Sequence, residues 1–199
     1  MLKSINKLSL LILFFLLIKI SISFGSISSN FITNITTEAS NILSSEKSKE
    51  IKIQELIQIG ENSVDIDGIG FYTLGKHRKK LNENQKNEYR RIFRDYFLKS
   101  FSNRLVEYKE AKIVVISEDI KNENYTIVKS KLLATSSRPE ITIDWRVYTK
   151  DPSKPIIRDL IIEGLSLART QREEFNSIIM NNGGDFKALF SSLKKFNKN

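Results

Sequence analysis

The string Gly164-Leu165-Ser166-Leu167-Ala168 is the part of the sequence closest to a catalytic motif. It mimics the G-x-S-x-G turn in which hydrolases present a nucleophilic serine between a strand and a helix. Such a serine needs a histidine base, which in that fold follows the serine in the chain. The one histidine, His77, lies far upstream in a run of basic residues, where an imidazolium is disfavoured. We therefore expect Ser166 to begin a helix, with Gly164 relieving the turn.

Acidic residues offer two further candidate sites. Asp65-x-Asp67-Gly68 contains part of a calcium-binding loop, but it lacks the third ligand position and the glutamate at position twelve. We expect a plain turn there. Asp159 and Glu163 alternate with apolar residues and, with Asp144, could face a cavity as catalytic carboxylates. A solvated face of a sheet is the interpretation we favour for Asp159 and Glu163.

The composition removes several kinds of site. The absence of cysteine excludes disulfides, a thiolate nucleophile and a cysteine-ligated zinc. A single histidine leaves almost no room for histidine-based metal sites. The run Lys76-His77-Arg78-Lys79-Lys80 could bind phosphate, but we expect a solvated loop with His77 at the surface. The sequence thus predicts no catalytic residue, no metal and no cofactor, and hence a protein that is not an enzyme.

The first 25 residues are typical of a signal peptide. Lys3 and Lys7 precede an apolar run from Leu8 to Ile18, which is too short to span a membrane. Small residues at 21, 23 and 25 fit a cleavage site, although an uncleaved anchor is the alternative. Residues 1–25 contain three lysines and no acid, so cleavage lowers the net charge from +9 to +6. An exported protein rarely meets nucleic acid, and the basic surface more plausibly faces lipid head groups or acidic proteins.

We interpret residues 26–199 as a single domain. Along it, apolar residues recur first at the spacing of helices, then at every second position as in strands, and then again at helical spacing. Asn82 and Gln85 can cap the clearest helix, whose apolar stripe carries five aromatic residues. Short breaks between the strands favour an antiparallel meander, which gives an α+β fold with four strands. The expected helices cover about 28–43, 51–59, 70–77, 82–108, 165–180 and 185–196, with a turn-rich stretch at 64–70 and strands at 112–118, 125–134, 140–150 and 156–163.

Two apolar surfaces dominate this plan. The long helix presents Tyr89, Phe93, Tyr96, Phe97 and Phe101, and the third strand presents Ile141, Ile143, Trp145 and Val147 on one side. The surfaces either pack together as a filled core or are held apart around a ligand cavity. Periodicity alone does not separate these alternatives.

An ordered set of short motifs over roughly residues 28–195 resembles the MlaC family of phospholipid-binding proteins, also called toluene-tolerance proteins. The set includes Leu74-Gly75, the Asn82–Phe93 helix start, Phe101-Ser102-Asn103-Arg104-Leu105, Asp144-Trp145-Arg146, Asp159 to Leu167, Arg172-x-x-Phe175, and Gly183-Gly184-x-Phe186-x-x-Leu189. The sequence departs from the family at His77 and Arg78, where two aromatic residues are usual.

The resemblance implies a periplasmic carrier that shuttles a phospholipid with two acyl chains between the outer and inner membranes. The implied partners are an inner-membrane Mla ABC transporter complex, an outer-membrane Mla lipoprotein–porin complex and, transiently, the membrane itself. The implied fold is a curved sheet wrapped by helices (28–108 and 165–196 around a sheet at 112–163), like the nuclear-transport-factor-2 and cystatin folds, with acyl chains in the cleft between them. The expected wall residues are Phe93, Phe97, Phe101, Ile141, Ile143, Trp145, Val147, Leu160, Ile162 and Leu165. A small-molecule enzyme on a similar cone-shaped fold and an envelope scaffold with a filled core are the alternatives.

Overall fold

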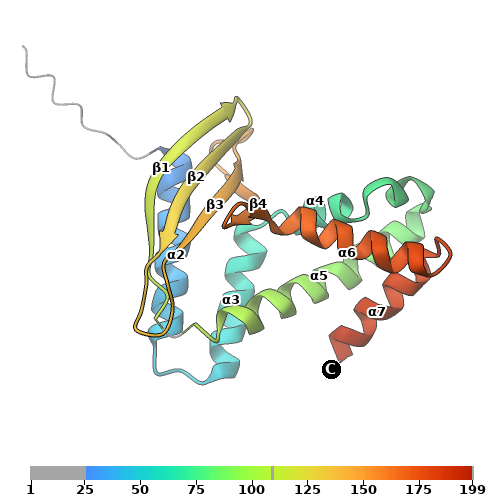
Figure 1. Ribbon diagram of the computed structural model, residues 1–199, viewed down its shortest axis with the longest axis horizontal. Helices are drawn as coiled ribbons and strands as arrows, with labels where there is room; N and C mark the ends of the chain where they lie inside the picture. Colours follow the sequence, from blue (N-terminus) through green and yellow to red (C-terminus); the bar gives the residue numbers. More distant parts are fainter. Residues whose placement is uncertain (1–25, 109, 199) are drawn as a thin grey trace, which may run out of the picture.

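The computed structural model describes residues 26–108 and 110–198, so the predicted signal peptide lies outside the described residues. The helices are α2 (Ile27–Ser44), α3 (Lys49–Ser63), α4 (Ile66–Thr73), the 3-10 helix η1 (Gly75–Lys80), α5 (Glu83–Leu105), α6 (Leu167–Asn181) and α7 (Phe186–Lys198). A sheet lies at one end of the molecule with α2 running along it, and α4 to α7 extend away from it (Figure 1). The predicted α+β class is confirmed.

The sheet is an antiparallel meander in which each strand pairs with the next. Its strands are β1 (Ile113–Asn122), β2 (Tyr125–Leu132), β3 (Ile141–Tyr148), β4 (Ile156–Ile162) and β5 (Leu165–Ser166). The meander is as predicted, but the predicted number of four strands is wrong, because the sheet has five. Glu163 and Gly164, with φ of 49° and 80°, form a tight turn that returns the chain beside β4. The returning strand is two residues long, too short to show an alternating pattern.

The longest helix, α5, begins where the sequence predicts. The amide of Gln85 donates to the Asn82 side chain at 2.9 Å, and the amide of Asn82 donates to the Gln85 side chain at 2.9 Å. This reciprocal cap satisfies two amides that the helix itself leaves free. The helix ends at Leu105 rather than at the predicted Tyr108, whose amide turns back to the carbonyl of Leu105 at 2.9 Å.

The segment between α3 and α5 differs from the prediction. We expected turns over 64–70 and a helix over 70–77, whereas α4 spans Ile66–Thr73 and a 3-10 helix follows it. Asp65 caps α4 by accepting from the amide of Gly68 at 3.0 Å. Gly70 lies inside the helix because Phe93 needs the space: a Cβ there would be 2.7 Å from the Phe93 Cδ1. Glycines that suggest a turn thus serve a close approach between two helices.

The expectation that His77 lies at the surface is also wrong. Its side chain is only 3% exposed, and its Nε2 pairs with Oδ1 of Asn176 on α6 at 3.0 Å. The 3-10 helix turns every third residue the same way, so one side chain of this basic run points inward while Lys76, Arg78 and Lys79 remain exposed.

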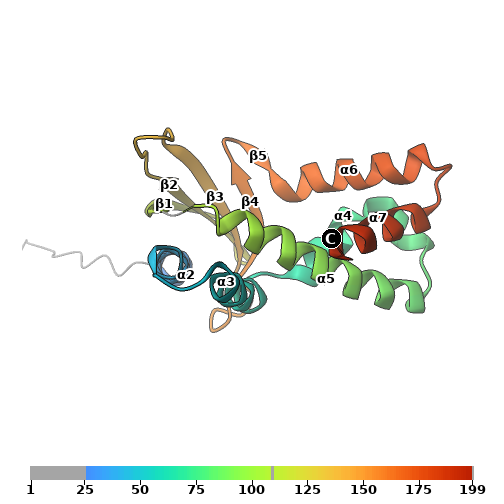
Figure 2. The same ribbon diagram turned by 90° about the horizontal axis from the view of Figure 1, so that it is seen from below.

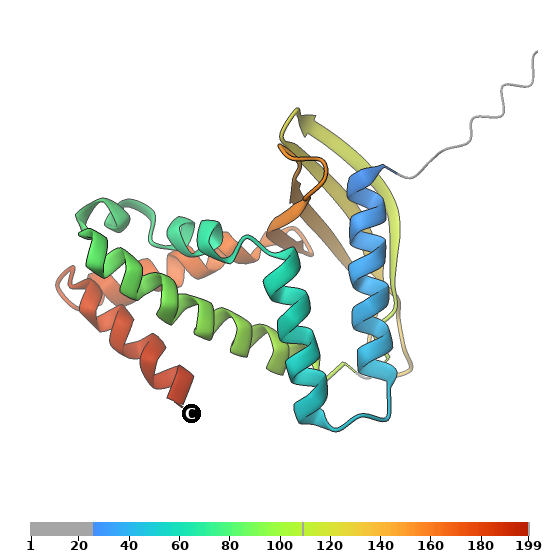
Figure 3. The same cartoon turned by 180° about the vertical axis from the view of Figure 1, so that it is seen from behind.

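Aromatic rings join α5 to α6 and α7. Tyr89 is 1% exposed and stacks on Phe93 and on Phe190 of α7, with ring centroids 5.7 Å and 5.5 Å apart. Phe93 meets Phe175 of α6 edge-on at 6.2 Å. Seen from behind, α2 and α3 lie side by side and α3 crosses the C-terminal half of α5 (Figure 3). The core of the helical part therefore centres on the first half of α5.

Burial of Tyr89 makes the fold sensitive to alkaline pH. Burial raises the pKa of its phenol above the ordinary value of 10.0, although the hydroxyl pairs with Thr73 at 2.9 Å. Above about pH 10 the unfolded chain releases this proton more readily than the folded chain, so stability is lost as the pH rises. We expect this group to lower the free energy of unfolding by about 1.4 kcal/mol per pH unit there. Urea unfolding of the wild type and of Tyr89→Phe measures the difference, and equal alkaline slopes in the two proteins would contradict the assignment.

Candidate functional site

The inner face of the sheet is the first apolar surface. Along β3, Ile143, Trp145 and Val147 are at most 9% exposed, whereas Thr142 and Arg146 are exposed. The predicted alternation of this strand is therefore confirmed. Two polar groups, the indole N–H of Trp145 and the hydroxyl of Ser130, are buried within this apolar face. Each of these two donors makes a hydrogen bond.

That polar pair fixes the orientation of Trp145. The indole Nε1 donates to the hydroxyl of Ser130 on β2 at 2.8 Å, and this hydroxyl donates to the carbonyl of Ile143 at 2.8 Å. In the sheet, Leu160 of β4 lies opposite Trp145, and Ile162 lies opposite Ile143. The indole is thus held among apolar neighbours in one position.

The second apolar surface is the stripe on α5, and its burial changes along the helix. Phe93 is 2% exposed, whereas Phe97 and Phe101 are half-buried. The rings of Phe97 and Phe101 stack with centroids 5.9 Å apart and planes 7° apart. Helices α6 and α7 cover the first half of this stripe, and the second half, nearer the sheet, is less covered.

The backbones that carry the two surfaces lie apart. Helix α2 packs on β1 and β2, whereas the close neighbours of α5 are α3, α4 and α7. Seen from below, α5 and α6 leave the sheet on opposite sides (Figure 2). Five apolar side chains on the stripe of α5 and on the inner face of β3 and β4 are half-buried. We call this set the half-buried apolar face: Phe97, Phe101, Ile141, Leu160 and Ile162.

The residues predicted as walls fall into three groups. Phe93, Ile143, Trp145 and Val147 are buried, and the five residues of the half-buried apolar face are partly exposed. Leu165 is 69% exposed at the start of β5, directly after the tight turn that follows β4, with its side chain in solvent. Phe97, Ile141 and Leu160 pack against the core that holds the buried group. Ile162 lies opposite Ile143 in the sheet and Phe101 stacks on Phe97, whereas Leu165 lies outside both groups.

A groove that the sequence did not indicate lies where α3 and α5 cross. Its volume is about 350 Å³, at the lower end for small-molecule pockets. Three apolar side chains line it, those of Ile53, Ile57 and Leu98, together with the polar residues Asp95, Lys99, Ser102 and Asn103. Gly60 permits the crossing, because a Cβ there would lie 3.1 Å from Leu98 and 3.4 Å from the ring of Phe101. No pattern in the sequence pairs these two helices.

The acidic candidates have structural roles. Asp159 is 4% exposed, so the expected solvated position is wrong for this residue. Its carboxylate accepts from the Ser166 hydroxyl at 2.6 Å and from the Ala168 amide at 3.0 Å. Ser166 in turn accepts from the Arg169 amide at 3.1 Å, so it begins α6 as predicted. With its hydroxyl bound to a carboxylate and no histidine beside it, Ser166 is not arranged as a nucleophile.

Removal of the Asp159 carboxylate tests this role. Asp159→Ala leaves the hydroxyl of Ser166 and the buried amide of Ala168 without their partner, and we expect a loss of about 2–3 kcal/mol in the free energy of unfolding. Asp151→Ala is the matched control, because Asp151 makes the same two kinds of bond to Ser153 in an exposed loop. It should cost less than about 1 kcal/mol in chemical denaturation. Equal losses would contradict a buried anchoring role.

Glu163, Asp65 and Asp67 also have partners within the fold. Glu163 accepts from the amide and hydroxyl of Thr142, and these hydrogen bonds lower the pKa of its carboxyl. Asp65 and Asp67 pair with Arg158 and Arg90 at 2.7 Å and 2.9 Å. The expected plain turn at Asp65 is thus a helix cap joined to arginine. Within 26–108 and 110–198, no group of three His, Cys, Asp or Glu side chains is placed to hold a metal ion.

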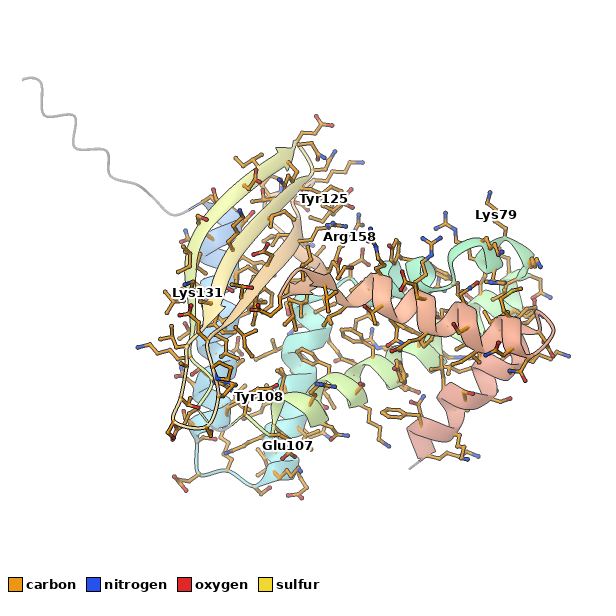
Figure 4. The ribbon with its side chains drawn as sticks, viewed as in Figure 1. Lys79, Glu107, Tyr108, Tyr125, Lys131 and Arg158 are labelled. Atoms are coloured by element: carbon orange, nitrogen blue, oxygen red, sulfur yellow. The ribbon has the colours of Figure 1, made fainter. Side chains whose placement is uncertain are left out.

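An arginine cluster joins α4 to the sheet and was not predicted. Besides its pair with Asp65, Arg158 donates to the hydroxyl of Tyr125 at 2.7 Å and lies 3.6 Å from the ring centre of Tyr148. Figure 4 shows Arg158 and Tyr125 together at one end of the strands. The partners come from three separate segments, so only the fold reveals the cluster. These contacts of Arg158 are all with other residues of the same fold, which indicates a structural role.

No helix within the described residues is long and apolar enough to cross a bilayer. No curated protein matches the chain by sequence. Among solved structures, the chain is similar to the phospholipid-binding protein from Ralstonia solanacearum in complex with a phospholipid. The two share 15% identity and a TM-score of 0.71, over 85% of this chain and 96% of that one, which shows a common fold.

The description "MlaC protein" belongs to the family model that matches residues 33–195. This match covers most of the chain and agrees with the motif order in the sequence. The buried aromatic half of α5, the inner face of β3 and the start of α6 all lie within it. The chain belongs to the MlaC family.

Proposed function

We propose that this protein binds a phospholipid, with the acyl chains lying against the half-buried apolar face. The observation that carries the proposal is the incomplete burial of Phe97 and Leu160, which pack against the buried core, and of Phe101, which stacks on Phe97. The Ralstonia solanacearum protein of the same fold is described in complex with a phospholipid. Separation of α5 from β3 supports the proposal, since side chains there can move apart without breaking backbone contacts.

A lipid carrier must bind its lipid about as strongly as a bilayer does, so that the lipid can both enter and leave. Two acyl chains hold about 30 methylenes, each stabilised by roughly 0.8 kcal/mol when removed from water. A bilayer offers the same benefit, so a carrier needs only a comparably apolar lining for exchange to be nearly neutral. Such a lining requires no reactive group. The proposed role is therefore binding and carriage rather than catalysis.

The competing enzyme hypothesis depended on Asp144, Asp159 and Glu163 facing a cavity. The hydrogen bonds of Asp159 and Glu163 are used to anchor α6 and β3. These contacts favour a binding protein. A scaffold with a filled core differs from a carrier only in having no ligand, so lipid content distinguishes those two.

We further propose that residues 1–25 direct export and that the protein works in the periplasm. There it would shuttle phospholipid between an outer-membrane Mla lipoprotein–porin complex and an inner-membrane Mla ABC transporter complex. The family assignment supports this placement. Intact mass of the protein recovered from the envelope tests the export step, because cleavage near residue 25 would remove the three lysines of the leader.

Native mass spectrometry tests the binding role. The protein, expressed at full length and purified as the cell processes it, should carry one phospholipid per chain. It should also extract labelled phospholipid from vesicles. Lipid-free protein that extracts nothing would reject carriage and favour the scaffold.

A further inference from the structure

The 3-10 helix η1 presents four exposed cations within five residues. We call this set the basic tip: Lys76, Arg78, Lys79 and Lys80. Among the residues that the structure describes, none of these four side chains makes a hydrogen bond or ion pair. Their positive charges therefore face solvent and are not neutralised by an acidic side chain of the described part of the fold.

Two acidic residues on the helices that flank the tip are already paired. Glu83, at the start of α5, binds Lys86 at 2.7 Å, and Asp67 of α4 binds Arg90 at 2.9 Å. Neither carboxylate forms a pair with the basic tip. The local positive field is therefore a property of the folded surface and not only of the sequence.

The tip is held in a defined shape. Leu74 and Leu81, which flank η1, are 1% and 4% exposed, and His77 between them is 3% exposed. The pairing of His77 with Asn176 ties the helix to α6. A rigid base lets the four cations face one surface together, whereas a flexible loop would disperse them.

The tip lies at the end of the molecule opposite the sheet. Residues 75–80 join α4 to α5 at that end in Figure 1, and Lys79 projects outward there in Figure 4. Tyr72 beside it is 41% exposed, with the Arg172 guanidinium 5.2 Å from its ring centre. Tyrosine residues are common at the interface between water and lipid, because the side chain has an apolar ring and a polar hydroxyl.

We propose that the basic tip docks this protein on the anionic surface of a phospholipid bilayer. Clustered lysines bind such surfaces through their summed charge and need no pocket. A protein partner would instead call for an apolar centre ringed by polar groups, and the tip offers a single exposed aromatic ring, Tyr72. The inference does not depend on lipid carriage, because it concerns head groups at the outside of the molecule.

Vesicle sedimentation tests the proposal. The wild type should bind vesicles of phosphatidylcholine with phosphatidylglycerol, bind pure phosphatidylcholine vesicles weakly, and be released by added salt. The triple variant Lys76→Gln, Lys79→Gln, Lys80→Gln should bind the anionic vesicles at least tenfold more weakly. Its partner for comparison is Lys187→Gln, Lys195→Gln, Lys198→Gln, which removes the same charge from exposed positions on α7. That control should bind nearly as well as the wild type.

Two results would overturn the proposal. Unchanged binding by the tip variant would show that the surface serves another partner, such as an acidic protein. Equal weakening in both variants would show that net charge alone attracts the protein. Circular dichroism and native mass spectrometry of both variants separate these results from misfolding or loss of lipid. Failure of carriage would remove bound lipid from the wild type, whereas failure of docking would not.

Discussion

Phe101→Asp is expected to abolish phospholipid co-purification while the protein stays folded. Phe101 is half-buried at the end of the aromatic stripe, so an aspartate there can reach water in the lipid-free protein. With acyl chains beside it, the carboxylate would be buried without a partner, which costs several kcal/mol, or about a hundredfold or more in lipid affinity. Native mass spectrometry should show at least tenfold less lipid per chain.

Two controls make this result specific. Ile116→Asp places the same charge on β1, at a side chain that is 58% exposed and outside the half-buried apolar face, and should leave lipid content unchanged. Phe101→Leu keeps the position apolar and should retain most of the lipid. Full lipid occupancy in folded Phe101→Asp would contradict the placement of the acyl chains.

Phe93→Ala is expected to cause the largest loss of stability. The ring of Phe93 contacts the rings of Tyr89, Tyr96, Phe97 and Phe175, so it links α5 to α6 at the centre of the helical core. Removal of a buried phenylalanine typically costs about 3–5 kcal/mol through lost burial and an unfilled cavity. For a chain of this size that corresponds to a fall of about 10 °C in Tm. Thermal unfolding followed by circular dichroism measures it.

The comparison for this substitution is Phe196→Ala. Phe196 also contacts an aromatic ring, that of Tyr96 at 5.0 Å, but it is 39% exposed near the end of α7. Its replacement should cost about 1 kcal/mol or less. If the two variants had the same Tm, the helical core would not centre on α5.

Elements whose pattern repeats directly in the sequence were predicted well. The stripe from Tyr89 to Phe101 and the alternation from Ile141 to Val147 both have the periods of their structures, and both reach the inside of the molecule. The cap formed by Asn82 was predictable because both partners lie within four residues.

Features that depend on distant partners were not predictable. Asp159 is buried because Ser166 and Ala168 return beside it after a tight turn, and a carboxylate in a strand otherwise suggests solvent. His77 is buried because Oδ1 of Asn176, 99 residues away, accepts a hydrogen bond from its ring. In each case the polar residue is inside only because the fold supplies its partner.

The half-buried apolar face could not be predicted from the periodicity of the sequence. Alternation assigned Ile143 and Trp145 to an inner face, yet it could not show whether α5 presses on that face. Three-dimensional packing makes α3, α4 and α7 the main backbone neighbours of α5, while the side chains of Phe93 and Trp145 belong to one buried core. The likeness to the nuclear-transport-factor-2 and cystatin folds stays a prediction.

The most direct test uses Trp145, the single tryptophan of the chain, which lies on the inner face of β3. Phospholipid with bromine atoms on its acyl chains quenches tryptophan fluorescence on contact. If acyl chains lie against this face, loading the protein with brominated lipid should quench most of the emission, whereas unbrominated lipid should not. Unchanged emission from protein that native mass spectrometry shows to hold one brominated lipid would contradict the account.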